Sequence, residues 1–422
     1  MANRLFRSSL SGRFDNYDGS GLRARINWEL RFARGGVGAI VSSWVGVDRR
    51  GMIVPGYASI DRDDRIPFWR EVGERVHEQG CKYILQLAHG GRQRDIPGID
   101  YPKGLSSTSK PDPLHGFECE RATPAQLREI AAAFGEGARR AREAGLDGVE
   151  IHGANGYLFT QFLSSAINDR KDEYGGSLEN QARLLLEVVR AIRARAGDDF
   201  HLQVKISVTE NVNAFLFWLG RGNTLDESVQ VCRWLEEAGV DAIHVSRGAS
   251  FPHPDNPAGD LPLKDVVEHY DTMLSSGIHA FRNYLLYRIW PVNRLMQHMW
   301  SRPVDRVEGA LLPDARAVKG AVSIPVLVTG GFQTASVIRK ALDDGDCDGV
   351  TIGRPLIANA NLPRLFAAGS DRAPRPCTYS NKCLFALLEA PLGCYDERRF
   401  DSREDMLAEI YSVFEPPPFV GS

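Results

Sequence analysis

The chain has 422 residues, of which 43% are hydrophobic and 25% are charged, the usual proportions of a globular protein. Its formal net charge is −3 and its Lys and Arg residues are scattered, so nothing indicates a nucleic-acid partner. No apolar run is long enough to span a bilayer, the first residues lack the apolar stretch of a signal peptide, and the seven cysteines are irregularly spaced. These features predict a cytoplasmic enzyme that acts on a small molecule and binds neither nucleic acid nor membrane.

Eight short β-branched runs alternate with longer amphipathic stretches along the chain. The predicted strands are residues 5–7, 39–42, 83–87, 148–152, 202–206, 242–245, 325–329 and 349–352. Helices are predicted between them, for example over residues 124–144 and 178–196. This alternation predicts an α/β fold with a parallel sheet, and the count of eight favours a closed (β/α)8 TIM barrel. An open Rossmann-type sheet is the alternative, but no G-x-G-x-x-G follows the first strand.

Two segments interrupt this alternation. Residues 93–121, after the third strand, are rich in Gly, Pro and Ser and predict a long loop over the barrel mouth. Residues 252–311, after the sixth strand, predict a helical, aromatic-rich insertion. This insertion is either a lid or subunit contact, which leaves a homo-oligomer open, or a set of helices that cover their own apolar face. We expect a barrel domain over residues 1–370, including the insertion, and a C-terminal extension over 371–422.

Glycines and an arginine end the last two predicted strands, at the edge where TIM barrels carry their chemistry. The seventh strand ends in Gly330-Gly331 and the eighth in Gly353-Arg354. Glycine lets backbone N–H groups approach a phosphate, and arginine adds charge-assisted hydrogen bonds. A glycine pair alone fits a tight turn equally well, but the two strand ends together favour a phosphate site.

The fourth strand ends in the sequence GVEIHGANGYL. His152 and Asn155 offer hydrogen-bond donors to one oxygen atom, and Tyr157 offers a weak acid. Donors aimed at a carbonyl oxygen stabilise the enolate that develops when hydride adds to a conjugated double bond, and a nearby phenol can supply the proton. The combination predicts the reduction of an α,β-unsaturated carbonyl.

The stretch GVEIHGANGYLFTQFLSSAINDRKDEYGGSLEN resembles the signature of the old yellow enzyme family, the FMN-dependent NAD(P)H:flavin oxidoreductases. GVGAIVSS, QLAHGGR, VTGGFQTA and IGRPLIANANLP are similar to other family motifs, in the same order as the strands. The resemblance covers nearly the whole chain. It implies a TIM barrel that holds FMN across its mouth, with NAD(P)H as the reductant of the flavin and an α,β-unsaturated carbonyl as the hydride acceptor.

The resemblance also implies a role for each strand end. Gln86 would bind the pyrimidine edge of the flavin, His152 and Asn155 would hold the substrate oxygen, and Tyr157 would donate the proton. The remaining flavin contacts would be Ser8 and Ser9 near the ring and Gly331, Gly353 and Arg354 at the phosphate.

Some positions depart from the family pattern. Lys205 stands on the fifth strand where the family has arginine; it would keep the positive charge at the flavin but lose the bidentate geometry. Trp44 follows the second strand, where the family often has a small residue, and either narrows the site or points into the protein. The chain begins almost at its first strand and stops near residue 422, so we expect neither the family's N-terminal barrel-closing segment nor the nucleotide-binding domains of its long members. Three residues after the fourth strand are expected to stabilise the fold: Arg170, Asp172 and Tyr174.

The C-terminal extension carries a degenerate cysteine motif. Cys377, Cys383 and Cys394 are similar to three of the four iron–sulfur ligands of the 2,4-dienoyl-CoA reductase and trimethylamine dehydrogenase branch, and Ser380 takes the place of the second. Because four thiolates normally hold such a cluster, we predict no intact metal site. The same branch leaves an alternative function open, the oxidative dehydrogenation or N-demethylation of a small amine. An alternative of another class is a flavin-binding protein without catalytic activity.

Overall fold

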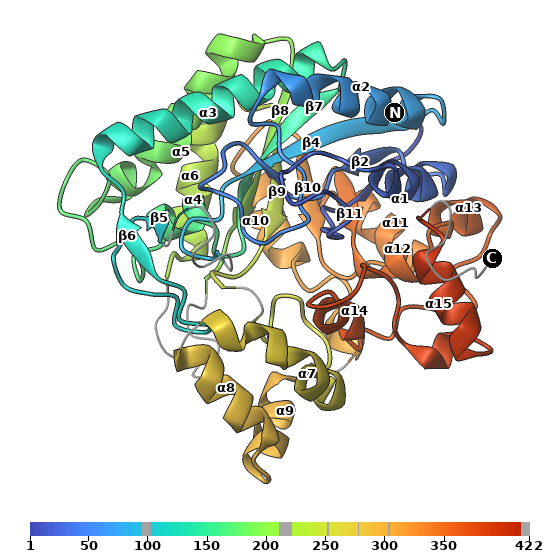
Figure 1. Cartoon of the computed structure of the whole chain (residues 1–422). Coiled ribbons are helices and arrows are strands. Elements are labelled where there is room, and N and C mark those ends of the chain that lie inside the picture. The colour runs from blue at the N-terminus through green and yellow to red at the C-terminus, as the bar shows by residue number, and fades with distance from the viewer. Residues whose placement is uncertain are drawn as a thin grey trace.

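The computed structural model describes residues 1–94, 101, 103–210, 222–250, 253–276, 278–302 and 304–414. Eight parallel strands form a closed barrel (Figure 1). They are β1 (Leu5–Arg7), β2 (Ala39–Val41), β4 (Lys82–Ala88), β7 (Gly148–Gly153), β8 (His201–Ser207), β9 (Ala242–Ser246), β10 (Val326–Thr329) and β11 (Gly349–Ile352). Because β1 pairs with both β2 and β11, the first and last strands close the circle. The predicted TIM barrel is confirmed, and every predicted strand matches an observed one to within one residue at each end.

Helices surround the barrel and bury the outer face of its strands, as parallel sheets require. The capping boxes at Thr123 and Thr224 fix where two of these helices begin. The helices after the strands are α1 (Arg23–Arg34), α2 (Ile66–His77), α3 (Pro124–Glu143), α4 (Leu158–Leu163), α5 (Leu178–Ala196), α6 (Leu225–Glu237), α10 (Leu312–Lys319), α11 (Ala335–Asp343), α12 (Arg354–Ala358) and α13 (Leu362–Ala367). Since each strand leads from the same end of the barrel into its helix, all eight C-terminal strand ends meet at one mouth.

The segment between β9 and α10 forms a helical lobe beside the barrel mouth (Figure 1). It contains α7 (Leu263–His269), η2 (Tyr270–Ser276), α8 (Ile278–Arg288), α9 (Val292–Trp300) and η3 (Val304–Arg306). Val266, Tyr287 and Trp300 pack into a small core of its own, together with Phe117 from the loop after β4 and Phe385 from the C-terminal extension. The insertion is therefore helical as predicted, and it covers part of its apolar surface by itself.

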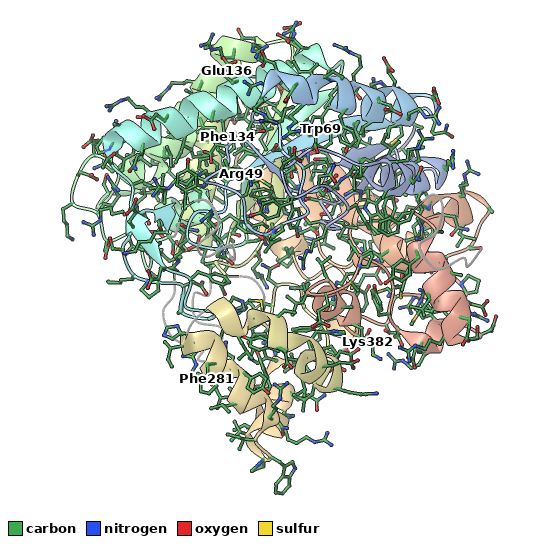
Figure 2. All side chains as sticks on the ribbon, in the orientation of Figure 1. Arg49, Trp69, Phe134, Glu136, Phe281 and Lys382 are labelled. Carbon is green, nitrogen blue, oxygen red and sulfur yellow. The ribbon has the colours of Figure 1, made fainter. Side chains whose placement is uncertain are left out.

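One face of α8 stays uncovered. The helix buries Ala280, Asn283 and Tyr287 on one side. Its exposed residues on the opposite side are apolar, and Phe281, labelled in Figure 2, is one of them. This exposed stripe consists of Ile278, Phe281, Leu285 and Ile289, which immediately follows the helix.

The segment over residues 93–121 differs in part from the expected loop. The prediction of a long loop did not include β5 (Gly104–Ser106) and β6 (Cys119–Arg121), which pair in parallel; residues 95–100 and 102 lie outside the described part. Pairing satisfies backbone groups that a bare loop would leave to water.

The other elements are β3 (Val45–Gly46), η1 (Asp63–Arg65), α14 (Lys382–Ala386), η4 (Glu397–Arg399) and α15 (Arg403–Tyr411). Over the described residues, no helix combines the length and the apolar character that crossing a bilayer demands.

Candidate active site

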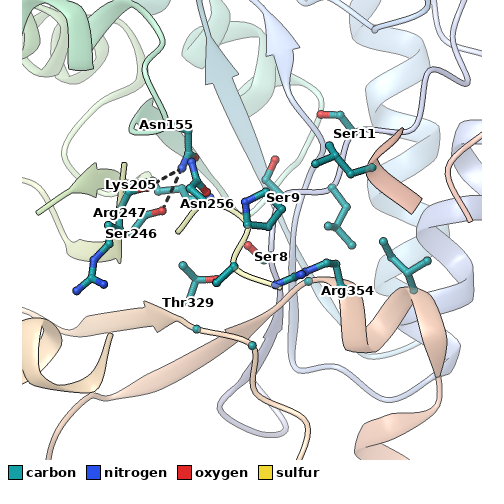
Figure 3. Close-up of a pocket in the computed structure, with 18 of the residues that line it drawn as sticks. Ser8, Ser9, Ser11, Asn155, Lys205, Ser246, Arg247, Asn256, Thr329 and Arg354 are labelled. Atoms are coloured by element: carbon teal, nitrogen blue, oxygen red, sulfur yellow. Dashed lines mark hydrogen bonds between the residues drawn. The ribbon is translucent and has the colours of Figure 1, made fainter. Parts of the chain in front are cut away.

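The C-terminal strand ends surround one cavity of about 320 Å³ (Figure 3). They come from strands that lie far apart in the sequence and meet only because the barrel closes. The cavity is lined by all ten residues that the sequence singled out for flavin or substrate, namely Ser8, Ser9, Gln86, His152, Asn155, Tyr157, Lys205, Gly331, Gly353 and Arg354.

His152 and Tyr157 lie side by side in the cavity, with ring centroids 4.9 Å apart. The backbone N–H of Ala154 donates to Nδ1 of His152 at 3.4 Å, so the proton of the neutral imidazole is on Nε2. Burial, followed by the positive charge of Lys205, holds the pKa of His152 well below its usual value. Burial also raises the pKa of Tyr157, which keeps its hydroxyl protonated. Neither Nε2 nor this hydroxyl hydrogen-bonds to another described residue, so both can meet a ligand.

Asn155 occupies the cavity wall in a left-handed conformation, with φ of 61°. Its side-chain amide donates to the carbonyl oxygen of Arg247 at 3.1 Å and toward Oγ of Ser246 at 3.4 Å (Figure 3). Its donors are therefore directed at the end of β9. In this arrangement His152 presents a free donor to the cavity, whereas Asn155 would have to release Ser246 to present one.

Lys205 places a buried amine in the cavity wall. It stands opposite His152 in the register of β7 and β8, and its side chain lines the cavity. Nζ makes no hydrogen bond or ion pair with any described residue. Burial lowers the pKa of Lys205, an effect that the nearby charge of Glu150 only partly offsets. Because an unpaired buried charge is costly, this position favours a ligand that brings negative charge or an acceptor oxygen.

A buried polar network beneath the cavity was not foreseen from the sequence. Glu150 accepts hydrogen bonds from Nε2 of Gln86 and Nδ1 of His244, both at 2.7 Å, and from Gln203. Burial would raise the pKa of Glu150, but the attraction of His244 and Lys205 and these hydrogen bonds lower it to about 2. Glu150 is thus ionised, while burial lowers the pKa of His244, an effect that the charge of Glu150 opposes.

This network fixes the orientation of Gln86. With its N–H group committed to Glu150, Gln86 turns Oε1 toward Ser9, whose hydroxyl donates to it at 2.7 Å. The register pairs Gln86 with Glu150 and Glu150 with Gln203 on adjacent strands. Side chains alternate between the two faces of each strand, and this register places Gln86, Glu150 and Gln203 side by side. Together these two features could have revealed the network from the sequence.

The loops after β10 and β11 form the far end of the cavity. Gly331 has φ of 68°, and a Cβ atom there would lie 2.7 Å from Cγ1 of Val307, so only glycine fits this turn. Arg354 lines the same end. The cavity therefore has one cation at its floor, Lys205, and another beside a glycine turn. These residues fit FMN: Lys205 would face the carbonyl edge of the ring, and Gly331 and Arg354 the phosphate.

Aromatic side chains form one wall. Trp44 lines the cavity, and its ring centroid lies 5.9 Å from that of Tyr57 and 6.5 Å from that of Tyr157. Trp44 therefore reaches the cavity wall, while most of its side chain is buried in a cluster with Met52 and Tyr57. Tyr57 lines the same wall and interacts through its hydroxyl with Ser11.

The family model for the NADH:flavin oxidoreductase / NADH oxidase family matches residues 1–272. The chain belongs to this family. It is 31% identical over 409 residues to an NADH oxidase of Thermoanaerobacter brockii, covering 95% of this chain and 52% of the relative. It is 30% identical to a cinnamate reductase of Clostridium sporogenes (86% of this chain, 50% of the relative) and 36% identical to an NADPH dehydrogenase of Halalkalibacterium halodurans (59% and 72%). The chain thus spans about half the length of the first two relatives.

Solved structures show the same fold for this NADH:flavin oxidoreductase family member. A 2-naphthoyl-CoA reductase complex superposes with a TM-score of 0.75 at 23% identity, over 93% of this chain and 54% of that one. An old yellow enzyme homologue from Zymomonas mobilis gives a TM-score of 0.65 at 21% identity, over 90% and 95%. Both agree with the barrel that the strand pattern predicts.

The cysteine motif of this family member lies next to the end of the cavity that Arg354 lines. Cys377, Ser380, Cys383 and Cys394 line one small void of about 20 Å³. Iron–sulfur clusters are normally held by four cysteine thiolates, and here a serine takes one of the four places. Within the described ranges, no three His, Cys, Asp or Glu side chains are arranged as metal ligands. Three thiols and a hydroxyl do not fit the four-thiolate set, and the lack of a cluster stays a prediction.

Proposed function

We propose that the chain is an FMN-dependent oxidoreductase of the ene-reductase type, with NAD(P)H as reductant and an α,β-unsaturated carbonyl compound as acceptor. The observation that carries this proposal is the pairing of a protonated Tyr157 with a neutral His152 whose Nε2–H is free. Membership of the family and relatives named NADH oxidase, NADPH dehydrogenase and cinnamate reductase support the same reaction class.

When bound, FMN supplies the hydride that the reaction requires. Nε2–H of His152 would bind the carbonyl oxygen of the substrate and stabilise the negative charge that develops there. The Tyr157 hydroxyl, on the adjacent ring, would hold a proton for the α-carbon. Trp44 would narrow the cavity around the substrate and exclude water. Lys205 and Gln86 would orient the pyrimidine edge, and Ser8, Ser9, Gly353 and Arg354 complete the proposed flavin contacts.

The test is an anaerobic titration of the purified protein. We expect bound FMN, bleaching of its absorption near 450 nm by NADH or NADPH, and recovery of the absorption when 2-cyclohexenone is added, on the order of one equivalent per flavin for each step. A protein that binds no FMN, or whose flavin neither nicotinamide bleaches, would contradict the proposal.

A second candidate function, oxidation of a small amine, is favoured by the aromatic wall. Trp44, Tyr57 and Tyr157 line the cavity with three aromatic rings, which suits a substrate carrying an alkylated nitrogen. A relative named N,N-dimethylglycine/sarcosine dehydrogenase from Chromohalobacter salexigens is 36% identical over 77% of this chain and supports the same idea. In the same anaerobic titration, N,N-dimethylglycine would be added in place of NADH or NADPH. Bleaching of the flavin absorption under these conditions would favour this alternative.

We also propose that two copies of the chain associate through the exposed stripe of α8. With the neighbouring Trp290 and Leu295, which are 76% and 59% exposed, the stripe offers on the order of 600 Å² of apolar surface per chain. Two such faces together reach the lower end of the area that stable interfaces bury, about 1,200 Å². A straight stripe along one helix is also complementary to its own copy in an antiparallel pair.

Light scattering after size exclusion tests this association. Since one chain weighs 46.8 kDa, we expect about twice that mass for the protein and the monomer mass for Phe281→Glu. Leu22→Glu, which changes an exposed leucine far from the lobe, is the matched control and should stay dimeric. A monomeric wild type at micromolar concentration would contradict the proposal.

The cytoplasm stays the proposed location. The seven cysteines are all free, which is the state that a reducing compartment maintains. Fractionation of cells that express the chain would test this directly.

A further inference from the structure

The loop that carries the degenerate cysteine motif has an unusual backbone. Tyr379 and Asn381 both adopt left-handed conformations, with φ of 54° and 58°. Non-glycine residues avoid this region unless their surroundings hold them there. Two such residues in one short loop indicate that the positions of their side chains are set by contacts elsewhere.

Asn381 joins three segments of the chain. Its Oδ1 accepts a hydrogen bond from Nη1 of Arg354 at 2.5 Å. Its Nδ2 donates to the carbonyl oxygens of Asp260 at 2.9 Å and Pro257 at 3.2 Å, at the base of the helical lobe. The side chain is only 6% exposed, and every polar group of its amide is used. Asn381 therefore holds the guanidinium of Arg354 against a fixed frame.

Tyr379 contacts the other half of the proposed phosphate site. Its hydroxyl donates to the carbonyl oxygen of Gly331, in the turn after β10. Its ring lies under the guanidinium of Arg354, 5.1 Å from ring centroid to Cζ. Its own carbonyl oxygen accepts from the N–H of Asp260 at 2.9 Å. The two residues thus reach Gly331 and Arg354 together, from the side away from the cavity.

We propose that the loop over residues 377–383 is a clamp that presets the phosphate end of the flavin site, with Asn381 and Tyr379 as positioning residues. This inference rests on the proposed flavin site and adds to it two residues that touch the protein rather than the cofactor. A guanidinium has five N–H donors, and Asn381 takes one of them while leaving the others for a phosphate. Because the amide is neutral, the full positive charge of Arg354 stays available to the ligand, which a carboxylate at this position would cancel.

The experiment compares FMN with riboflavin, which has the same ring system and no phosphate. Dissociation constants are measured by flavin fluorescence on the apoprotein, prepared by reversible removal of the flavin. We expect Asn381→Ala to weaken FMN binding by about tenfold or more, the usual size of a lost hydrogen bond to a charged group. Riboflavin binding should change by less than about twofold, because it needs no guanidinium.

Three further variants sharpen the test. Asn381→Asp keeps the size of the side chain and adds a negative charge that competes with the phosphate for Arg354. It should therefore weaken FMN binding at least as much as Asn381→Ala does. Tyr379→Phe removes only the hydroxyl that holds Gly331, and it should also weaken the binding of FMN more than that of riboflavin. Asn359→Ala is the matched control, because the Asn359 amide hydrogen-bonds to Arg375 and Arg399 rather than to Arg354. Thermal unfolding of each apoprotein shows whether the variants fold.

The double variant Arg354→Ala/Asn381→Ala decides the mechanism. If Asn381 acts through Arg354, the double variant binds FMN no more weakly than Arg354→Ala alone. Additive losses, or equal losses for FMN and riboflavin, would overturn the clamp. Should Asn381→Ala fail to fold, Asn381→Asp and Tyr379→Phe carry the same comparison. A wild type that binds neither flavin would instead contradict the proposed function, so the two failures are distinguishable.

Discussion

His152 and Lys205 stand directly opposite each other on β7 and β8, and both line the cavity at the barrel mouth. Burial and the charge of Lys205 hold the pKa of His152 well below its usual value. The imidazole therefore stays neutral across the physiological range, with its proton on Nε2. Lys205 contributes a basic amine and His152 a neutral N–H donor, so the cavity offers two chemically different groups to a ligand.

Replacing Tyr157 should separate the two halves of the reaction. In Tyr157→Phe we expect flavin reduction by NAD(P)H near the wild-type rate, because that step needs no proton from this side chain. Enone reduction should fall by about 10² to 10⁴, the usual effect of losing a positioned acid. Stopped-flow absorbance measures both steps. Tyr57→Phe, in the same aromatic wall, is the control, and an unchanged enone rate in Tyr157→Phe would show that another group donates the proton.

Replacing Lys205 should have opposite effects on the empty and the loaded protein. Lys205→Met removes a buried amine that pairs with no described residue, so the apoprotein should melt at a higher temperature, while FMN should bind more weakly. The lowered pKa of Lys205 also makes the stability of the apoprotein depend on pH. Above the folded pKa and up to the ordinary value of about 10.5 the unfolded chain binds more protons, so wild-type apoprotein gains stability as pH rises.

Calorimetry of the apoprotein from pH 7 to 10, with FMN titrations alongside, checks both statements about Lys205. The increase in apoprotein stability with rising pH should be smaller in Lys205→Met. It should persist in Lys171→Met, which changes an exposed lysine. Equal melting of the wild-type and Lys205→Met apoproteins would mean that the buried charge has a partner.

Glu210 gives a separate pH dependence near neutrality. Burial raises its pKa to about 7, although the backbone N–H of Asn223 donates to its carboxylate at 3.2 Å. Between the ordinary value near 4.5 and 7 the folded chain holds the extra proton, so stability falls as pH rises through this window, by on the order of 3 kcal/mol in total. Glu210→Gln should flatten this fall in denaturant titrations at pH 5 and pH 8, whereas the exposed Glu237→Gln should leave it unchanged.

Ser380 should decide whether the cysteine void can hold a cluster. It lines the same void as Cys377, Cys383 and Cys394. We expect no stoichiometric iron or sulfide in the protein purified without oxygen, and about four irons per chain in Ser380→Cys, which completes a four-thiolate set. Ser380→Ala serves as the control. Four irons in the wild type would contradict this expectation.

The fold was largely predictable because its signals are local. Each barrel strand is a short β-branched run, and the strand ends carry glycine, histidine or arginine within a few residues. The ten candidate residues converge because every βα unit ends at the same mouth. Locating them required only the number and the order of the strands.

What escaped prediction depends on contacts between distant segments. The hydrogen bonds of Glu150 reach His244, two strands further along, and no local pattern reports that distance. The amide of Asn155 turns toward Arg247, which only the position of β9 decides. The support of Arg354 by Asn381 was hidden because the motif around Asn381 suggests a metal site, while its observed contacts are to a guanidinium and to backbone carbonyls.

The pairing of β1 with β11 sets the order of events during synthesis. Leu5 leaves the ribosome long before its partner Val350 is made. Until then one edge of the nascent sheet has no neighbour, and exposed strand edges are where chains misassociate. Ser8 and Arg354, on opposite sides of this seam, line the same cavity. The cofactor should therefore bind only a finished barrel, so its yellow colour would report completed folding as well as the ability to react.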